Sequence, residues 1–272
     1  MVKNFSLALV TGASSGIGLA LCRLLAEKNI PLIITGRDSD KLTALADELK
    51  AQVNVIAFTA DLAKAEGRAS AIANIYKYQP DLIINNAGFG LYGEVLSYET
   101  SDQLDIVNVD ASAVLELTLE GARCLLSNKK KGVILNVSSA AALQIFPGMA
   151  VYSACKTFVN MISQSFDFEM RPYGIRVLAA CPGMVATAFK YRAGGIKKNR
   201  AKAPVMTPCY AAEQIWWQIE KEKGLHIFDW KTRLITVISR FIPQTWLLKY
   251  LFYNITSRIE PRKPISRSQY KI

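Results

Sequence analysis

Six short hydrophobic segments recur along the chain, and longer segments of a different pattern lie between them. The short segments are residues 5–10, 31–35, 53–58, 81–85, 132–137 and 175–180. Their hydrophobic residues run almost continuously instead of alternating with polar ones, which is typical of strands covered on both faces. We therefore predict six buried strands of a parallel sheet.

The segments between these strands have hydrophobic residues at helical spacing. They lie near residues 17–28, 39–50, 64–77, 101–127 and 149–170. A regular alternation of strand and helix predicts an α/β fold with one doubly wound parallel sheet and helices on both faces. We assign residues 1–229 to this domain. A loop rich in Gly and Lys follows the sixth strand at about 183–208.

Residues 230–272 form a separate, helical and basic extension in this interpretation. Trp230, Leu234 and Phe241 recur at helical spacing, and Pro243 is placed to start a second helix. Such aromatic and basic amphipathic helices can lie in a membrane interface, cap a lipophilic pocket or contact a partner subunit. All three alternatives fit an apolar substrate better than a sugar, and residues 230–259 are the candidate for peripheral membrane contact.

The formal net charge of +11 is concentrated in the last quarter of the chain. Residues 1–196 hold 18 Lys or Arg against 17 Asp or Glu, whereas residues 197–272 hold 15 against 5. No recognised nucleic-acid-binding module accompanies this charge, so we predict no nucleic-acid partner. The basic residues of the loop at 183–208 either face water or meet an anionic group of a bound molecule.

Cysteine and histidine content excludes several kinds of site. The five cysteines are scattered and include no Cys-x-x-Cys pair, which is typical of reduced thiols in the cytoplasm. The single histidine, His226, has no nearby ligand set, so we predict a structural or surface residue and no metal site. The hydrophobic start leads directly into a glycine-rich loop without a signal-peptide cleavage site. We expect a cytoplasmic protein, with peripheral membrane contact as the alternative.

Three glycines separate the first predicted strand from the first helix. Gly12, Gly16 and Gly18 stand in the pattern Thr-Gly-x-x-x-Gly-x-Gly. Glycines at such a junction allow a tight turn and a close approach to a pyrophosphate, which then lies at the helix N-terminus. Because a strand precedes the loop and a helix follows it, the pattern predicts a dinucleotide-binding site rather than a simple turn.

The end of the second strand indicates which dinucleotide is bound. A site selective for NAD usually has a carboxylate here, whereas this chain has Gly36 followed by Arg37. The guanidinium fork suits a 2′-phosphate, so we predict NADP(H), with NAD as the alternative. The next residue, Asp38, has a carboxylate that could bind the ribose 2′-hydroxyl instead, if the second strand ends one residue later.

The motifs taken together resemble those of the short-chain dehydrogenase/reductase family over about residues 5 to 187. They are "TGASSGIG" (11–18), Asp61, "NNAG" (85–88), Asn108, "NVSS" (136–139), Tyr152-x-x-x-Lys156 and "PGMVAT" (182–187). The resemblance implies that residues 1–229 form a single Rossmann-type catalytic domain and that the loop at about 183–208 is a substrate lid. It also implies a set of cofactor-binding residues, namely Gly12, Ser14, Ser15, Gly16, Ile17, Gly18, Arg37, Asp61, Leu62, Asn86, Ala87, Gly88, Tyr152, Lys156, Pro182, Gly183 and Thr187.

The resemblance further implies four catalytic residues. Asn108 would kink its helix and hold a water of a proton relay, and Ser139 would hydrogen-bond the substrate carbonyl, with Ser138 as its alternative. Tyr152 and Lys156 lie one helical turn apart and share a face. A free tyrosine has a pKa of about 10, and a nearby ammonium is expected to lower it toward the working range.

These observations predict an NADP(H)-preferring oxidoreductase that interconverts a carbonyl and an alcohol, with Tyr152 as the proton donor or acceptor. The alternatives are an NAD-dependent alcohol dehydrogenase and a non-catalytic redox sensor that binds NADP(H). Sugar-nucleotide epimerases share Tyr-x-x-x-Lys, but their greater length and different glycine spacing argue against them. The chain lacks the final strand with an Asp-Gly-Gly turn that builds the family's usual tetramer, so we expect a homo-oligomer that is a dimer rather than a tetramer.

Overall fold

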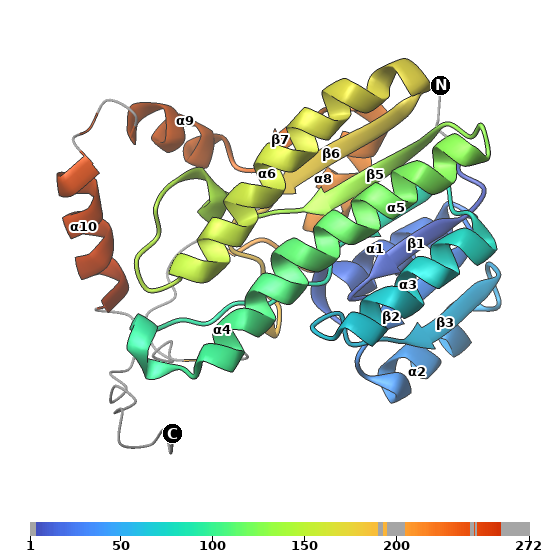
Figure 1. Cartoon of the computed structure of the whole chain (residues 1–272), viewed down its shortest axis with the longest axis horizontal. Coiled ribbons are helices and arrows are strands. Elements are labelled where there is room, and N and C mark those ends of the chain that lie inside the picture. The colour runs from blue at the N-terminus through green and yellow to red at the C-terminus, as the bar shows by residue number, and fades with distance from the viewer. Residues whose placement is uncertain (1–3, 190–192, 195–204, 240–241, 243, 257–272) are drawn as a thin grey trace.

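A computed structural model shows one seven-stranded sheet between two layers of helices (Figure 1). It describes residues 4–189, 193–194, 205–239, 242 and 244–256. All strand pairs are parallel, and the order is β3-β2-β1-β4-β5-β6-β7. The strands are β1 (Ala8–Thr11), β2 (Leu32–Gly36), β3 (Val55–Thr59), β4 (Leu82–Asn85), β5 (Gly132–Val137), β6 (Ile175–Cys181) and β7 (Leu225–Ile227).

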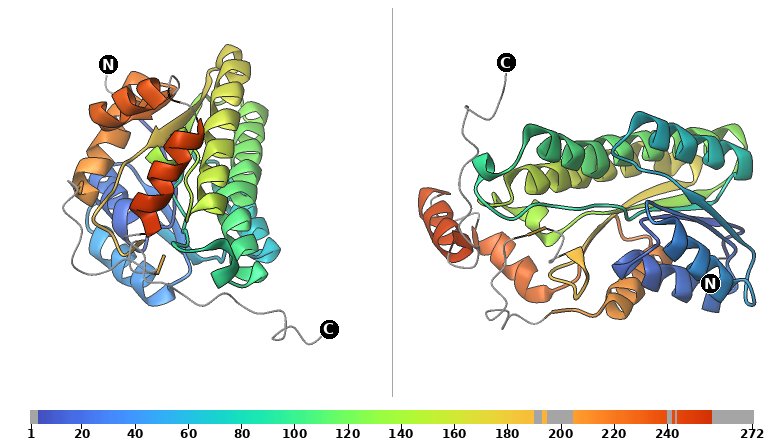
Figure 2. Two further views of the ribbon diagram at one scale, coloured as in Figure 1. Left: turned by 90° about the vertical axis from the view of Figure 1, so that its left-hand side faces the viewer. Right: turned by 90° about the horizontal axis from the view of Figure 1, so that it is seen from below.

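The helices divide into two layers, which the right-hand view of Figure 2 shows above and below the sheet. One layer contains α1 (Gly16–Glu27), α2 (Ser39–Leu49) and α8 (Pro208–Lys221). The other contains α3 (Ala65–Tyr78), α4 (Thr100–Val107), α5 (Ala113–Ser127) and α6 (Ala150–Met170). Short 3₁₀ helices are η1 (Val95–Ser97), η3 (Ala140–Leu143) and η4 (Arg171–Tyr173).

Alternate residues of each strand point to opposite layers, which explains the continuous hydrophobic segments. In β1, Ala8 and Val10 belong to the core beneath α1 and α8, whereas Leu9 belongs to the core beneath α3 and α5. All three are fully buried. Successive side chains of a strand leave the sheet on opposite faces, so a strand covered on both faces needs hydrophobic residues at every position.

The fold that the pattern predicts is confirmed, with three differences in its elements. All six predicted strands and five predicted helical regions occur near their predicted bounds. The helix predicted at 101–127 is interrupted by the π-helix η2 (Asn108–Ser112). The helix α8 and the strand β7 were not predicted, and the statement that the chain lacks a final strand was wrong. β7 has only three residues and contains His226, so its hydrophobic signal is weak.

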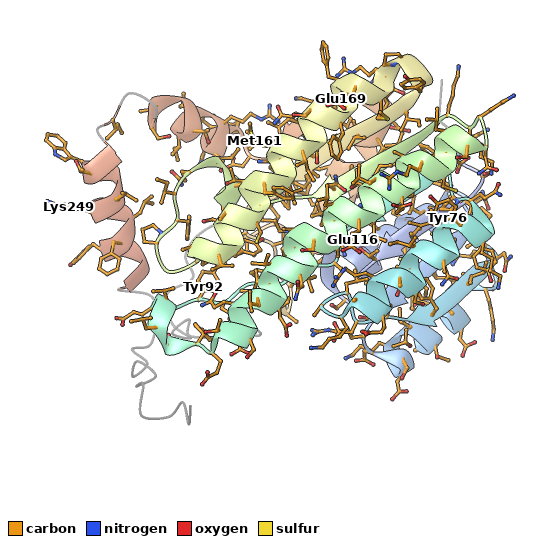
Figure 3. All side chains as sticks on the ribbon, viewed as in Figure 1. Tyr76, Tyr92, Glu116, Met161, Glu169 and Lys249 are labelled. Carbon is orange, nitrogen blue, oxygen red and sulfur yellow. The ribbon has the colours of Figure 1, made fainter. Side chains whose placement is uncertain are left out.

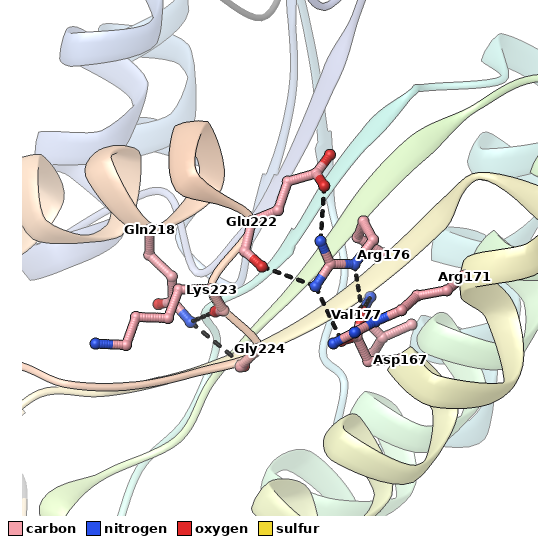
Figure 4. A network of polar contacts seen from close by, with 8 residues as sticks. All are labelled: Asp167, Arg171, Arg176, Val177, Gln218, Glu222, Lys223 and Gly224. Atoms are coloured by element: carbon pink, nitrogen blue, oxygen red, sulfur yellow. Dashed lines mark hydrogen bonds and ion pairs between the residues drawn. The ribbon is translucent and has the colours of Figure 1, made fainter.

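An ionic network around the buried Asp167 carboxylate fastens the end of α6 to β6 and to the loop before β7 (Figure 4). The Asp167 carboxylate accepts hydrogen bonds from the Arg176 guanidinium at 2.7 Å and from the Arg171 guanidinium at 2.6 Å. It also accepts one from the backbone N–H of Val177 at 3.0 Å. Arg176 in turn donates to the Glu222 carboxylate at 2.7 Å. The network therefore fixes the position of β7 at the edge of the sheet.

Two further helices follow β7, as predicted for the C-terminal extension. They are α9 (Trp230–Ser239) and α10 (Gln244–Thr256). Figure 1 shows α10 at one end of the molecule, beyond the layers that cover the sheet. Among the described residues, no helix combines the length and hydrophobicity that crossing a bilayer requires. Pro243 and Phe241, which the sequence placed between and within these helices, lie outside the described residues.

Candidate active site

A cavity of about 850 Å³ lies at the carboxyl ends of the strands. Its walls come from the loops after β1, β2, β3, β4, β5 and β6. The strand order reverses between β1 and β4, which is where open α/β sheets bind ligands. Every residue predicted for cofactor binding or catalysis lines this cavity except Gly18 and Asn108.

The glycine-rich loop has the backbone geometry that the motif predicts. Gly12 and Gly16 adopt φ angles of +67° and +58°, in the region that favours glycine. A Cβ atom on Gly18 would lie 2.3 Å from the carbonyl oxygen of Gly12, so Gly18 allows the start of α1 to pack against the loop. Ser15 occupies the N-cap position of α1 and lines the cavity. The helix N-terminus is thereby placed to attract a phosphate.

Asn86 fixes the glycine-rich loop to the neighbouring loop after β4. Its side-chain amide donates to the carbonyl oxygen of Thr11 at 2.9 Å. The hydroxyl of Thr11 accepts hydrogen bonds from the backbone N–H groups of Asn86 and Ala87, both at 3.0 Å. A Cβ atom on Gly12 would lie only 2.8 Å from the Cα atom of Ala87. The two loops form one rigid wall of the cavity.

The residues after β2 and β3 form the outer part of the same wall. Arg37 lines the cavity with its guanidinium 5.9 Å from the centre of the Phe89 ring. Asp38 also borders the cavity, but its carboxylate caps α2 by accepting a hydrogen bond from Lys41 N–H at 3.1 Å and pairs with the Lys41 ammonium. Asp61 accepts a hydrogen bond from Ala63 N–H at 3.1 Å. Leu62 beside it is buried at the cavity wall.

The predicted catalytic side chains come together at the other end of the cavity. Tyr152 and Lys156 lie on one face of α6 and are 8% and 3% exposed. The Lys156 ammonium is 5.7 Å from the centre of the Tyr152 ring, and the Ser139 hydroxyl lies close enough to the Tyr152 hydroxyl to act against the rise in the Tyr152 pKa. Ser138, the alternative, instead donates to the carbonyl oxygen of Lys156 at 3.0 Å and anchors α6. Of the two serines, Ser139 is the one that acts on the pKa of Tyr152.

Asp110 is a site residue that sequence reasoning missed. Its buried carboxylate forms an ion pair with the Lys156 ammonium at 2.7 Å and accepts a hydrogen bond from Phe89 N–H at 3.0 Å. Lys156 also donates to the carbonyl oxygen of Val137 at 2.9 Å. A Cβ atom on Gly88 would lie 2.5 Å from Asp110 Oδ1, so glycine at position 88 makes room for the pair. Asp110 follows the predicted catalytic residue Asn108 by two positions, and this closeness in sequence was the only available signal.

Burial controls the titration of this group of side chains. It raises the pKa of Tyr152 above its ordinary value, the Lys156 ammonium opposes this change, and the Asp110 carboxylate adds to it. Burial lowers the pKa of Lys156, but Asp110 and Tyr152 together outweigh it, so the pKa of Lys156 is raised. Burial also raises the pKa of Asp110, with Lys156 acting against it. Lys156 therefore acts in the predicted direction on the Tyr152 pKa but does not lower it overall.

Asn108 lies at the break between α4 and α5 and not in the cavity wall. The backbone N–H of Ala113 donates to the carbonyl oxygen of Asn108, a bond that spans five residues and opens the π-turn. This extra residue in the turn directs Val109 to the cavity and Asp110 to Lys156. The predicted kink is present, and the proton-relay role of Asn108 stays a prediction.

Residues after β6 close the cavity beside the catalytic side chains. Pro182, Gly183 and Thr187 line the wall, and a Cβ atom on Gly16 would lie 2.9 Å from the Thr187 side chain. The carbonyl oxygen of Ala193 accepts a hydrogen bond from Tyr92 N–H at 2.9 Å. The basic lid residues fall outside the described residues, namely Lys190, Arg192, Lys197, Lys198, Arg200 and Lys202.

Hydrophobic side chains surround the space in front of Tyr152. The Phe189 ring lies 5.4 Å from the Tyr152 ring, and Phe146 and Met149 belong to the same hydrophobic cluster as Tyr152. Met184 also lines the cavity. Thr232 of α9 also reaches this wall. His226, in contrast, lies away from the cavity, where it bonds Gln214 at 3.1 Å, and its pKa is lowered to about 4 by burial.

A family model described as short chain dehydrogenase matches residues 6–194. The chain belongs to the short-chain dehydrogenase family. An uncharacterised oxidoreductase of Staphylococcus aureus is 31% identical to this family member over 228 residues, which are 83% of this chain and 96% of the relative. A second uncharacterised oxidoreductase, from Staphylococcus saprophyticus, is 27% identical over 213 residues, which are 76% and 91% of the two chains.

Solved structures share the fold of this short-chain dehydrogenase over nearly its whole length. A short-chain dehydrogenase from Sphingobium yanoikuyae in complex with NADPH has a TM-score of 0.79 and 25% identity, covering 97% of this chain and 99% of that one. The bulky-bulky ketone specific alcohol dehydrogenase from Comamonas testosteroni has a TM-score of 0.74 and 22% identity, covering 99% and 100%. The second likeness shows the fold alone.

Proposed function

We propose that this oxidoreductase interconverts a carbonyl group and an alcohol on an apolar substrate, with NADP(H) as the hydride carrier. The observation that carries the proposal is the meeting of Ser139, Tyr152 and Lys156 in the same cavity as the glycine-rich loop. When bound, the nicotinamide supplies or accepts the hydride. The chain itself has to hold the substrate and move one proton.

Each catalytic side chain has a distinct task in this proposal. The Tyr152 hydroxyl donates a proton to the carbonyl oxygen during reduction and takes it back during oxidation. The Ser139 hydroxyl donates a hydrogen bond to the same oxygen and stabilises its developing negative charge. Lys156 stabilises the phenolate that Tyr152 leaves behind, because an ammonium nearby favours the charged form of a phenol.

Three features support NADP(H) over NAD(H). Arg37 lines the cavity after β2, where its guanidinium can bind a 2′-phosphate. The competing carboxylate of Asp38 is engaged in capping α2 and pairing with Lys41. The similar structure from Sphingobium yanoikuyae carries NADPH. We therefore propose that the free energy of cofactor selection comes mainly from Arg37.

The cofactor preference is tested by titrating the wild-type protein and Arg37→Ala with NADPH and NADH. Loss of a charge-assisted hydrogen bond is worth roughly 1.5 to 3 kcal/mol, so the Kd for NADPH should rise about tenfold or more. The Kd for NADH should stay unchanged, and Arg123→Ala, at an exposed site on α5, should behave like the wild type. Tighter binding of NADH than NADPH by the wild type would refute the preference.

The activity is tested by following NADPH consumption with a panel of ketones and aldehydes of increasing chain length. Removing the proton donor in Tyr152→Phe should lower kcat by roughly 10² to 10⁴, the range for general acid–base catalysis. Tyr173→Phe is the matched control, because Tyr173 is 55% exposed and lies outside the cavity. Equal turnover by Tyr152→Phe and wild type would remove Tyr152 as the donor. NADPH binding without turnover of any carbonyl would favour the redox sensor.

A further inference from the structure

The helix α9 presents its hydrophobic side to solvent and its polar side to the protein. Leu234, Ile235 and Ile238 share one face and are 50%, 55% and 48% exposed. Thr232 on the opposite side lines the cavity, and Thr236 is half-buried. A surface helix of a globular protein normally has the reverse arrangement. The outer face of α9 therefore has the character of a contact surface.

The helix α10 also exposes hydrophobic and basic side chains. Trp246 is 71% exposed, and Lys249, three residues later on the helix, is exposed as well. Figure 3 shows Lys249 at the end of the molecule. Leu248 and Leu251 face a different side and are half-buried. We define the α9–α10 face by seven of the exposed residues of the two helices, which are Trp230, Lys231, Leu234, Ile235, Ile238, Trp246 and Lys249.

The charge of this segment is of one sign. Residues 230–259 contain five Lys or Arg and no Asp or Glu. Lys231 lies one turn from Leu234 and Ile235, so an ammonium is placed within the exposed hydrophobic stripe of α9. Basic side chains beside exposed Trp, Leu and Ile are the combination that binds in the headgroup region of a bilayer with anionic lipids.

We propose that the α9–α10 face binds the surface of an anionic lipid bilayer, with both helices lying in the interface. The hydrophobic stripe would be buried at the boundary of headgroups and acyl chains, and the basic residues would contact lipid phosphates. A second copy of the chain fits this face less well, because apposed copies would bring together two segments that hold only positive charges. The proposal does not depend on the catalytic function.

The position of the face gives it a functional consequence. Thr232 lines the cavity and Leu234, two residues later, belongs to the outer face, so the proposed membrane contact borders the cavity. The cavity wall beside Tyr152 is hydrophobic at Phe146 and Phe189. A bilayer bound to the α9–α10 face would bring its apolar molecules close to the catalytic side chains.

The binding is tested by sedimenting the full chain with vesicles of phosphatidylcholine alone and of phosphatidylcholine with three parts in ten of phosphatidylglycerol. We expect co-sedimentation with the anionic vesicles, weakened by raised salt, and little with the neutral ones. Absence of binding to anionic vesicles, or equal binding to both kinds, would overturn the proposal.

Two double variants locate the contact. Leu234→Ser/Ile238→Ser removes the hydrophobic stripe and should lower the partition coefficient about tenfold, from the loss of buried hydrophobic area. Lys231→Glu/Lys249→Glu should lower it by a similar factor through loss of attraction to anionic headgroups. The control for the first variant is Met161→Ser/Phe168→Ser, which removes hydrophobic residues of α6 that are 62% and 78% exposed. The control for the second is Lys64→Glu/Lys77→Glu, which reverses two exposed charges elsewhere on the molecule. Both controls should bind like the wild type. Unchanged binding by both α9–α10 variants would refute the assigned face.

A second copy as the occupant gives a different result in the same samples. Light scattering after gel filtration would then show a dimer that Leu234→Ser/Ile238→Ser converts to a monomer, without binding of the wild type to anionic vesicles. That outcome would replace the bilayer with a subunit interface. Circular dichroism of each variant checks that the fold is kept, so that a loss of binding reports on the surface.

Discussion

At the scale of single residues, the candidate site is governed by a carboxylate that carries no motif of its own. Asp110 neutralises the ammonium of Lys156 at 2.7 Å and adds to the rise in the Tyr152 pKa. The other groups acting on these two side chains are Cys155 of α6, Cys181 of β6 and Ser139. A serine hydroxyl and thiols of raised pKa cannot replace the Asp110 charge.

We predict that Asp110→Asn changes the pH dependence as well as the rate. Without the carboxylate, the Lys156 ammonium acts on Tyr152 alone, so the phenol should lose its proton at lower pH. For alcohol oxidation, in which the phenolate is the base, the rising limb of the kcat profile should shift to lower pH. Misplacement of the Lys156 ammonium should also lower the maximal kcat by about tenfold or more.

Two measurements separate this role from a purely structural one. The ring-carbon chemical shift of Tyr152, assigned with Tyr152→Phe, reports its pKa directly and should move in the same direction as the kinetic profile. Asp102→Asn, which removes an exposed carboxylate on α4, is the control and should leave both unchanged. If the rate falls but the pH profile and the Tyr152 pKa do not change, Asp110 has only a structural role in packing.

Sequence reasoning found the residues whose spacing is local and missed the one whose partner is distant. Tyr152 and Lys156 are four residues apart on one helix, so their shared face follows from helical geometry. Asp110 meets Lys156 only because the π-turn directs it there and Gly88 leaves the space. Neither contact has a signature in the sequence around Asp110. The net direction of the Tyr152 pKa was missed for the same reason, because it depends on burial.

At the scale of secondary-structure elements, the ionic network around Asp167 fastens α6 to β6 and β7. The hydrogen bonds from Arg176 and Arg171 hold the pKa of Asp167 below its ordinary value, although burial acts against them. The unfolded chain therefore binds a proton more readily than the folded one. The stabilisation is complete above the unfolded-state pKa and is lost as the pH falls through the lowered folded-state pKa.

We predict that Asp167→Ala destabilises the fold at neutral pH by about 3 kcal/mol, because it removes the buried carboxylate that Arg171, Arg176 and the Val177 N–H share. That corresponds to a fall in Tm of about 6 to 12 °C for a chain of this size. The difference from wild type should narrow as the pH falls below about 4, where the wild-type carboxyl also becomes protonated. Glu169→Gln, at an exposed site on the same helix, should have a Tm within about 2 °C of wild type. A pH-independent difference would contradict the linkage.

Elements with a long and regular pattern were predictable, and short ones were not. The six predicted strands and the helix α6 follow from hydrophobic runs and periodicity that local sequence contains. The strand β7 has three residues, and it exists because β6 offers an open edge and the Asp167 network positions its loop. Both causes are tertiary contacts, so the hydrophobic pattern of the local sequence could not predict β7.

At the scale of the whole molecule, cofactor binding and global stability should be coupled. The cavity is formed by loops that follow six parallel strands, from β1 to β6, so a dinucleotide bound there contacts both halves of the sheet. A ligand that binds only the folded chain stabilises it by RT ln(1 + [L]/Kd), about 2.7 kcal/mol at one hundred times the Kd. The unfolded chain cannot reproduce this arrangement of loops.

We therefore predict that saturating NADPH raises the Tm by about 5 to 10 °C, the shift that a gain of this size gives in a chain of this length. The same concentration of NADH should raise it less, because it lacks the phosphate that Arg37 is proposed to bind. In Arg37→Ala the Tm increases with NADPH and with NADH should become equal. In the control Arg123→Ala they should differ as in the wild type. Differential scanning fluorimetry measures all of these shifts. Equal shifts with NADPH and NADH in the wild type would show that the charge at the end of β2 does not select the cofactor.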